Sequence, residues 1–253
     1  MAKQSPEYAH LRLTDRIEPG VRVLLIGINP GVTSALTGHH FAGPTNRFWR
    51  LLYESGIVPE PITYEDDVRL PEWGIGMTNL VARPSPGIDV LKPAEYLDGW
   101  RLLEQKIDRF RPQIVAFVGV TMYRALWKVL GHTDAPEIRP GFQKATVHGA
   151  RLFVLPNPSG RNANFSYQEM LDAFRSLRRA IRRLPRRAEA RRTLSARPRP
   201  ARRPTADAAS AGPAGAAAGK SPRAAETTPR TTTWPPAAAP SRRARHMRVG
   251  SRS

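Results

Sequence analysis

The feature that most constrains the fold is a short apolar run that ends in a sharp turn. Val23-Leu24-Leu25-Ile26 contains only aliphatic residues, which is typical of a strand covered on both faces in a parallel sheet. Gly27-Ile28-Asn29-Pro30-Gly31 follows at once, and its glycines and proline favour a tight turn. Open α/β sheets bind ligands outside the carboxyl ends of their strands, so we predict that Asn29 faces a ligand site.

A simpler interpretation is that Asn29 only forms the turn, because Asn-Pro and Pro-Gly are ordinary turn dipeptides. A second stretch of the same kind argues against it. The apolar run 151–155 is also typical of a buried strand, and it enters the loop Pro156-Asn157-Pro158-Ser159-Gly160-Arg161-Asn162. Two predicted strands therefore end in loops rich in Asn, Pro and Gly.

Strand and helix patterns alternate over the first 180 residues. Thr45 is a predicted N-cap for a helix that ends at Gly56, whereas 32–44 and 57–72 are expected to be irregular. The other predicted helices are 93–110, 121–130 and 166–181, and the other predicted strands are 74–81, 114–119 and 151–155. This order predicts an α/β fold, a three-layer α/β/α sandwich with a mostly parallel central sheet.

Charge separates the folded part of the chain from its end. Residues 181–253 hold 18 of the 40 Lys and Arg and 3 of the 21 Asp and Glu, a net charge of +15. The same residues are rich in Ala, Pro, Ser and Thr and hold few large apolar side chains, so they cannot bury enough surface to fold. We therefore predict a polar N-terminal segment (1–19), a catalytic domain (20–183) and a disordered basic tail (184–253).

Composition excludes several kinds of covalent link, metal site and catalytic group. The chain has no cysteine, which excludes disulfides, thiolate zinc sites, iron–sulfur clusters and cysteine nucleophiles. His39-His40 is no metal signature, because adjacent residues rarely ligate one ion and no carboxylate lies near in sequence; we expect neither metal nor cofactor. No apolar stretch reaches about eighteen residues, so we expect no membrane partner and a cytoplasmic protein, associated with the nucleoid if it is bacterial.

The chemistry of an asparagine limits the reaction. Gly27–Gly31 has no serine at the centre of a nucleophile elbow and no Lys-Ser/Thr pair of a phosphate loop. An amide neither takes a proton at neutral pH nor attacks a substrate, but its carbonyl oxygen can accept a hydrogen bond from a water molecule and hold it in line. Asn29 therefore suits a reaction with an easy leaving group, such as a base anion that departs from a sugar carbon.

Four segments together resemble the mismatch-specific uracil-DNA and thymine-DNA glycosylases. They are Gly27–Gly31, Gly38–Trp49, Gly76–Val81 and Asn157–Gly160, which occur in the family's order. The resemblance covers about residues 20–180 and implies the uracil-DNA glycosylase fold. It also implies a monofunctional enzyme that hydrolyses the N-glycosidic bond of uracil opposite guanine in duplex DNA, after flipping of the base.

The resemblance also implies roles for single residues. Asn29 would hold the attacking water, Phe41 would stack on the flipped base, and the backbone near Ile28 and Phe41 would read the base edge. Other positions implied for the base pocket are Gly31, Ser34, Thr78 and Asn157. The wedge that fills the vacated stack and contacts the widowed guanine would be Ser159, Gly160, Arg161 and Asn162.

Two departures from the family pattern stand out. Bacterial members often carry Leu in the wedge, where this chain has Arg161, whose stem can fill the gap while its head reaches phosphate or guanine. The Asp-containing loop that activates water in fast uracil glycosylases is missing, which favours a slow enzyme that stays bound to its product.

Two other functions remain possible on the sequence. One is a non-catalytic protein that senses mismatches or binds DNA through its basic tail, and the other is an enzyme acting on free nucleosides, which the wedge loop disfavours. The expected partner is duplex DNA with a G:U or G:T mismatch, bound by a monomer. The sequence leaves open the preferred lesion among uracil, thymine, hypoxanthine and alkylated or etheno bases, and the partner of the tail.

Overall fold

The computed structural model describes residues 7–132 and 137–185. A five-stranded sheet forms the middle layer, in the order β2-β1-β3-β5-β4, with β4 antiparallel and the other strands parallel. The strands are β1 (Val23–Gly27), β2 (Ile75–Asn79), β3 (Ile114–Val118), β4 (Gly141–Val147) and β5 (Ala150–Leu155). All residues of β1 and β3 are buried, so the prediction of strands covered on both faces is confirmed.

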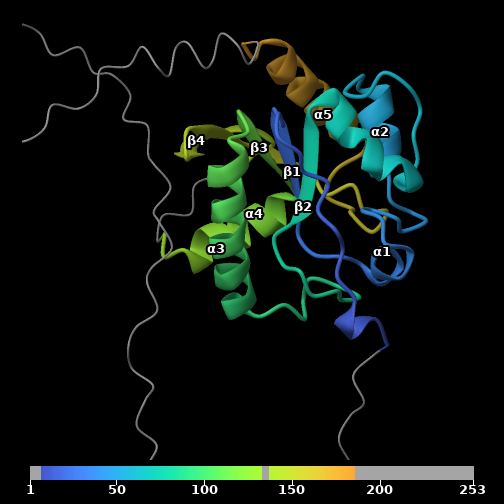
Figure 1. Ribbon diagram of the computed structural model, residues 1–253, viewed down its shortest axis with the longest axis vertical. Coiled ribbons are helices and arrows are strands. Elements are labelled where there is room, and N and C mark those ends of the chain that lie inside the picture. Colours follow the sequence, from blue (N-terminus) through green and yellow to red (C-terminus); the bar gives the residue numbers. More distant parts are fainter. Residues whose placement is uncertain (1–6, 133–136, 186–253) are drawn as a thin grey trace, which may run out of the picture. The chain divides into compact units, whose positions relative to one another are not determined.

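Helices cover both faces of the sheet, which confirms the predicted three-layer sandwich (Figure 1). Leu24 and Ile26 of β1 pack with α3 and α4, whereas Val23 and Leu25 pack with α2 and α5, as the alternation of a strand requires. The helices are α1 (Val32–Thr37), α2 (Phe48–Glu54), α3 (Pro93–Phe110), α4 (Val120–Val129) and α5 (Tyr167–Arg182), with the 3₁₀ helices η1 (Glu7–His10) and η2 (Tyr64–Trp73).

The structure corrects four details of the prediction. The segment 32–44 contains α1, and 57–72 contains most of η2, although both were expected to be irregular. The N-cap of α2 is Arg47 and not Thr45. The strand β4 was not predicted, because it lies at the sheet edge, is half exposed, and therefore lacks a continuous apolar run.

Both ends of the domain are tied to the sheet. Arg16 exchanges two backbone hydrogen bonds with Met77, at 2.9 and 2.8 Å, so the N-terminal segment covers part of the open edge of β2. The predicted capping box of α5 is present, with Ser166 and Glu169 bonded reciprocally. Arg22 donates to the carbonyls of Ile181 and Leu184 at the end of α5. The tail lies outside the described residues from 186 onward.

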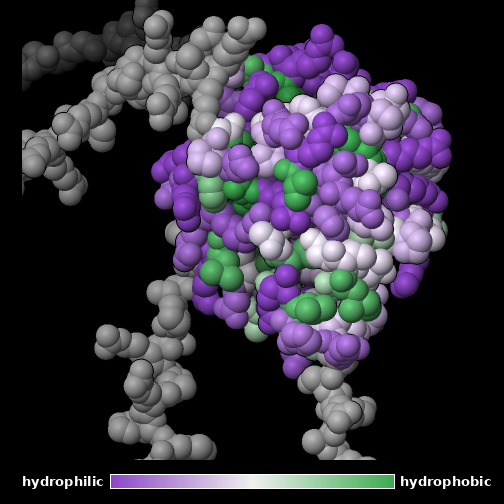
Figure 2. Space-filling view, turned by 45° about the vertical axis from the view of Figure 1, so that its right-hand side comes forward, coloured by the Kyte–Doolittle hydropathy of each residue, from purple (hydrophilic) through white to green (hydrophobic). Residues whose placement is uncertain are grey.

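The surface shown in Figure 2 is mainly hydrophilic, with apolar residues in small separate patches. Scattered apolar residues of this kind are normal on a protein surface and mark no extended apolar interface on this face. Within residues 7–132 and 137–185, no helix combines the length and the apolar character that a membrane span requires.

Candidate active site

The loops predicted to carry function follow the carboxyl ends of the parallel strands and therefore lie at the same end of the sheet. Here β1 lies between β2 and β3, and the register pairs Gly27 with Asn79. Beyond β3, the strand β5 ends at Leu155 and continues into the predicted wedge loop. Parallel pairing therefore brings Asn29, Asn79 and the wedge loop to the same edge.

The side chain of Asn29 is held through its amide nitrogen. Its Nδ2 donates to the hydroxyl of Ser85 at 2.8 Å and to the carbonyls of Pro30 and Arg83 at 3.1 and 3.2 Å. No residue of the described part of the chain bonds to its Oδ1. The interpretation of Asn29 as a mere turn former does not explain these contacts, because two of the three acceptors come from a distant loop.

Ser85 decides which way the Asn29 amide points. It is 2 % exposed, and its own hydroxyl donates to the carbonyl of Gly87 at 2.5 Å. A hydroxyl whose proton is already committed can only accept a second bond, so it must face the amide nitrogen of Asn29. The carbonyl oxygen Oδ1 is thus presented as an acceptor for water. Sequence reasoning missed Ser85, because nothing in the segment 84–87 distinguishes it from a Pro-rich turn.

Phe41 is fixed as a flat platform. Its ring stacks on Phe48 with centroids 4.1 Å apart and planes at 15°, so one face is covered by protein. The hydroxyl of Ser34, which is buried, accepts from the N–H of Ala42 at 3.0 Å and anchors the backbone beside Phe41. Phe41 has a φ of 52°, a costly value for a residue with a side chain. Such a conformation is kept only where the surroundings impose it, as they do at binding sites.

Asn79 presents a second polar group beside this platform. Burial lowers the pKa of His40 below its ordinary value, which favours the neutral ring. Its Nε2 lies 3.2 Å from the carbonyl of Thr14 and therefore carries the proton, so Nδ1 accepts from Asn79 Nδ2 at 3.5 Å. The oxygen of Asn79 then points toward Gly27, where a Cβ would collide with it and would press on the Phe41 ring.

A buried carboxylate holds this part of the site together. Asp67, fully buried on η2, accepts from Arg16 Nε at 2.9 Å and from the backbone N–H of His40 at 2.9 Å. His39 Nδ1 lies 3.1 Å from the same side chain. Both histidines therefore have structural partners. Within residues 7–132 and 137–185, no group of three or more His, Asp or Glu residues is arranged to hold a metal ion.

The structure places Thr78 away from the predicted base pocket, which corrects that assignment. Its hydroxyl donates to Asp15 at 2.5 Å and accepts from Lys106 at 3.0 Å. Successive residues of a strand point to opposite faces, so Thr78 lies on the face of the sheet opposite to Asn79. The polar residue beside Phe41 is consequently Asn79, which follows Thr78 in the sequence.

Ile28 and Gly31 remain at the turn beside Asn29. The carbonyl of Ile28 accepts from the N–H of Val81 at 2.8 Å, so this carbonyl already has a hydrogen-bond partner within the protein. Gly31 is the N-cap of α1, and its carbonyl accepts from Ala35 at 2.9 Å. A Cβ at Gly31 would meet no atom within 4 Å, so there is room for a side chain at this position.

The predicted wedge loop is held by its own side chains. Asn157 Oδ1 accepts from the N–H of Ser159 at 3.0 Å, and its carbonyl accepts from Asn162 Nδ2 at 2.7 Å. The N–H of Arg161 donates to the hydroxyl of Ser159 at 3.3 Å. Asn157 therefore shapes the loop, and its place in the base pocket stays a prediction. Arg161 is exposed, and no described residue pairs with its guanidinium.

The wedge loop packs directly against the segment that carries the platform. The N–H of Arg47 donates to the carbonyl of Pro158 at 3.0 Å. A Cβ at Gly160 would come within 2.7 Å of the Cβ of Thr45, so only glycine fits there without a shift. The position of the wedge relative to Phe41 is therefore set by packing.

Two of the cavities in the described part of the molecule lie near these elements. One of about 190 Å³ opens beside the wedge loop and the start of α4; Val120, Thr121, Asn157, Ser159, Arg161, Asn162, Asn164 and Phe165 line it. The larger, of about 740 Å³, lies between the end of α2 and α5 and includes Gly56 and Arg178. Asn29 and Phe41 line neither of these two cavities.

Comparison with known proteins identifies the family. A family model described as Uracil DNA glycosylase superfamily matches residues 14–182, the range that holds the sheet and every site residue above. The chain belongs to this superfamily. A G/U mismatch-specific uracil DNA glycosylase from Schizosaccharomyces pombe is 40 % identical to it over 147 residues, which are 56 % of this chain and 45 % of the relative.

This superfamily member thus spans less than half the length of its Schizosaccharomyces pombe relative. Among solved structures, a candidate uracil DNA glycosylase from Methanosarcina acetivorans, determined by NMR, matches with a TM-score of 0.44 and 18 % identity. That match covers 66 % of this chain and 98 % of the other.

Proposed function

We propose that the protein is a monofunctional DNA glycosylase that hydrolyses the N-glycosidic bond of uracil opposite guanine in duplex DNA and leaves an abasic site. The observation that carries this proposal is the fixed amide of Asn29, whose nitrogen is bonded to Arg83 and Ser85 so that its oxygen faces outward. The superfamily and the specificity in the name of the Schizosaccharomyces pombe relative, a G/U mismatch-specific uracil DNA glycosylase, support the choice of uracil.

The reaction begins with extrusion of the uracil nucleotide from the duplex. Unpairing costs a few kcal/mol and is least costly at a mismatch, so a U:G pair is favoured before any protein contact forms. The free face of Phe41 is available to stack on the extruded base, while Phe48 covers the other face. Arg161 on the wedge loop fills the vacated stack.

Hydrolysis then requires little more than a positioned water. The carbon–nitrogen bond breaks, the base leaves with the bonding electrons, and the oxygen of water bonds to the sugar carbon. Asn29 Oδ1 accepts from that water and holds it in line, but takes no proton. The proton released by the water finally passes to solvent or to the departing base.

Asn79 provides the contact with the base in this proposal. Its oxygen accepts a hydrogen bond from the N3–H of uracil, a donor that neutral cytosine lacks. The neutral ring of His40 accepts from the Asn79 nitrogen, so that this nitrogen faces His40 and the Asn79 oxygen faces the base. Thymine is a poorer substrate because Ser34 and Phe41 are held in place by Ala42 and Phe48 and yield little room for a 5-methyl group.

The test is single-turnover base release by the full-length protein from duplexes with U:G, T:G or U:A at one position. We expect the fastest release from U:G and much slower release from T:G. Asn29→Ala should still bind the U:G duplex but lose about 10²-fold or more in rate, because only water positioning is removed. A parent protein that binds U:G without releasing uracil would contradict the proposal, and a variant rate within a few-fold of the parent would reject Asn29 as the water ligand.

A further inference from the structure

The position of Asn29 depends on a loop outside the four segments that carry the family resemblance. Two of the three acceptors of its amide nitrogen, the Arg83 carbonyl and the Ser85 hydroxyl, belong to the loop between β2 and α3. A shift of this loop moves both acceptors together. The alignment of the attacking water in the proposed reaction therefore depends on what anchors the loop.

Backbone hydrogen bonds from Val81 to Ile28 and from Ser85 to Pro30 hold the start of this loop, and the side chain of Arg83 adds an ion pair that ties it to α3. Arg83 Nε and Nη2 donate to the two oxygens of Glu95 at 2.7 and 3.0 Å, and Nη2 also donates to the carbonyl of Val90 at 3.2 Å. A two-pronged contact of this kind fixes both distance and orientation, which a single-point contact does not. The same residue thus binds Asn29 with its backbone and Glu95 with its side chain.

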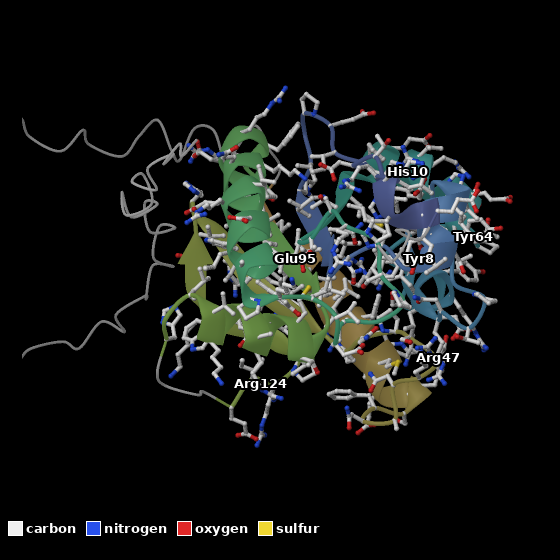
Figure 3. The ribbon with its side chains drawn as sticks, turned by 90° about the horizontal axis from the view of Figure 1, so that it is seen from below. Tyr8, His10, Arg47, Tyr64, Glu95 and Arg124 are labelled. Carbon is white, nitrogen blue, oxygen red and sulfur yellow. The ribbon has the colours of Figure 1, made fainter. Side chains whose placement is uncertain are left out.

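Glu95 is in turn fixed to the first turn of α3. Its Oε2 accepts from the backbone N–H of Lys92 at 2.9 Å, as in a capping box, and it lies where the loop enters the helix (Figure 3). The Arg83 side chain lowers the pKa of Glu95 to about 2, so the carboxylate stays charged at neutral pH. A rigid helix of the domain therefore holds the loop through one continuous chain of contacts.

We propose that the Arg83–Glu95 pair is a positioning device for the reaction, which holds the Asn29 amide in place through the carbonyl of Arg83. This inference rests on the proposed function. Neither side chain is proposed to touch substrate. Loss of the pair should misalign Asn29 without removing any contact with DNA.

The test compares Glu95→Gln and Arg83→Met with the parent in the full-length protein. Glutamine can keep the bond to the Lys92 N–H, and methionine keeps the backbone carbonyl that Asn29 uses. We expect single-turnover release of uracil from U:G duplex to fall about 5- to 50-fold in each variant, because small displacements of a positioning group are costly. The Kd for a duplex with a non-cleavable deoxyuridine analogue should stay within about 3-fold of the parent, too little to account for that fall.

A matched control is Asp98→Asn, which removes the same charge from the same helix. Asp98 is exposed on α3 and pairs with Arg101 at 2.8 Å, and its carboxylate makes no hydrogen bond to the described residues of the β2–α3 loop. Asp98→Asn should release uracil at the same single-turnover rate as the parent. In an Asn29→Ala background, Glu95→Gln should have no further effect on the rate; a full additional loss there would overturn the proposal, since Glu95 would then act by another route.

A readout without activity separates this inference from the proposed function. The side-chain amide protons of Asn29, observed by NMR, should exchange faster with solvent in Glu95→Gln and Arg83→Met than in the parent and in Asp98→Asn. Unchanged exchange in the two variants would overturn the role of the pair, whether or not the protein releases uracil. A parent that releases no uracil would instead reject the proposed function, while the exchange rates still decide whether the pair holds Asn29.

Discussion

The proposed role of Asn29 as a water ligand requires one of the two orientations of its amide, the one in which Oδ1 is free to accept. The hydroxyl of Ser85 selects that orientation, because its own proton is committed to the carbonyl of Gly87. Backbone carbonyls of Pro30 and Arg83 add two more acceptors on the same side. The chemistry of this residue is therefore set by its neighbours as much as by its own side chain.

Ser85→Ala tests this selection. The variant removes one acceptor from Asn29 and leaves the Gly87 carbonyl with one partner fewer. A cost of about 1 kcal/mol in amide alignment corresponds to a fall of about 5-fold in the release of uracil. Duplex affinity should not change. Ser85→Thr, which keeps the hydroxyl, is the control and should recover most of the rate; an alanine variant as fast as the parent would show that the carbonyls alone suffice.

Among the structural elements, the wedge loop has the clearest separable role. Its own residues hold its conformation, since Asn157 bonds to Ser159 and Asn162 and Gly160 packs on Thr45. Arg161 is the one cation of this loop and is exposed. Its backbone N–H donates to the hydroxyl of Ser159, but its guanidinium has no partner among the described residues. The loop thus presents Arg161 toward whatever binds at the strand ends.

Arg161→Ala should weaken activity on duplex DNA more than on single-stranded DNA, because only a duplex leaves a gap to fill. Single-turnover rates on U:G duplex and on the single strand carrying the same uracil measure the difference. Arg109→Ala is the matched control, since Arg109 is also exposed but lies in the last turn of α3, far along the chain from the wedge. An equal loss of rate on both substrates would indicate that Arg161 contacts only phosphate and fills no gap in the duplex.

The junction of the β2–α3 loop with α3 should respond to acid. The pKa of Glu95 is about 2 when folded and near 4.5 when unfolded, so this group favours folding above about pH 4.5 and loses that effect as the pH falls toward 2. Glu95→Gln should therefore be less stable than the parent at pH 7. The difference between their urea midpoints should shrink between pH 5 and pH 3; a constant difference would indicate that the charge of Glu95 contributes nothing.

For the whole molecule, the uneven charge makes the tail a candidate for non-specific DNA binding. Residues 181–253 carry +15, and a polycation binds duplex DNA by releasing counterions. A protein ending at residue 185 keeps the Arg22 contacts with the end of α5 and is the right comparison. If about six tail cations contact phosphates, the salt dependence of affinity should be steeper by about five log units per log unit of salt in the full chain.

Titration of undamaged duplex at several salt concentrations measures both slopes. Single-turnover release of uracil at saturating enzyme should be the same with and without the tail, because the strand-end site lies within the matched residues 14–182. Identical slopes would mean that the tail does not engage DNA. A rate that falls on truncation would instead assign the tail a part in catalysis.

The sequence alone determined the layers of the fold and the position of the turn that carries Asn29. Apolar runs, capping residues and glycine turns act over a few residues, so the buried strand before Asn29 and the capping box of Ser166 could be predicted. The loop 156–162 that follows β5 was also predicted from local sequence, whereas its role as a wedge came from the family resemblance. These features depend on interactions between near neighbours in the chain, which a sequence displays directly.

Only the tertiary structure decided which polar groups surround the site. The parallel register brings Asn79, and not Thr78, to the face that holds Phe41, and no local pattern distinguishes the two residues. Ser85 and Glu95 become relevant because the β2–α3 loop folds back onto Asn29, more than fifty residues earlier in the chain. Contacts of this kind depend on how distant segments pack together, and that packing is a property of the whole domain.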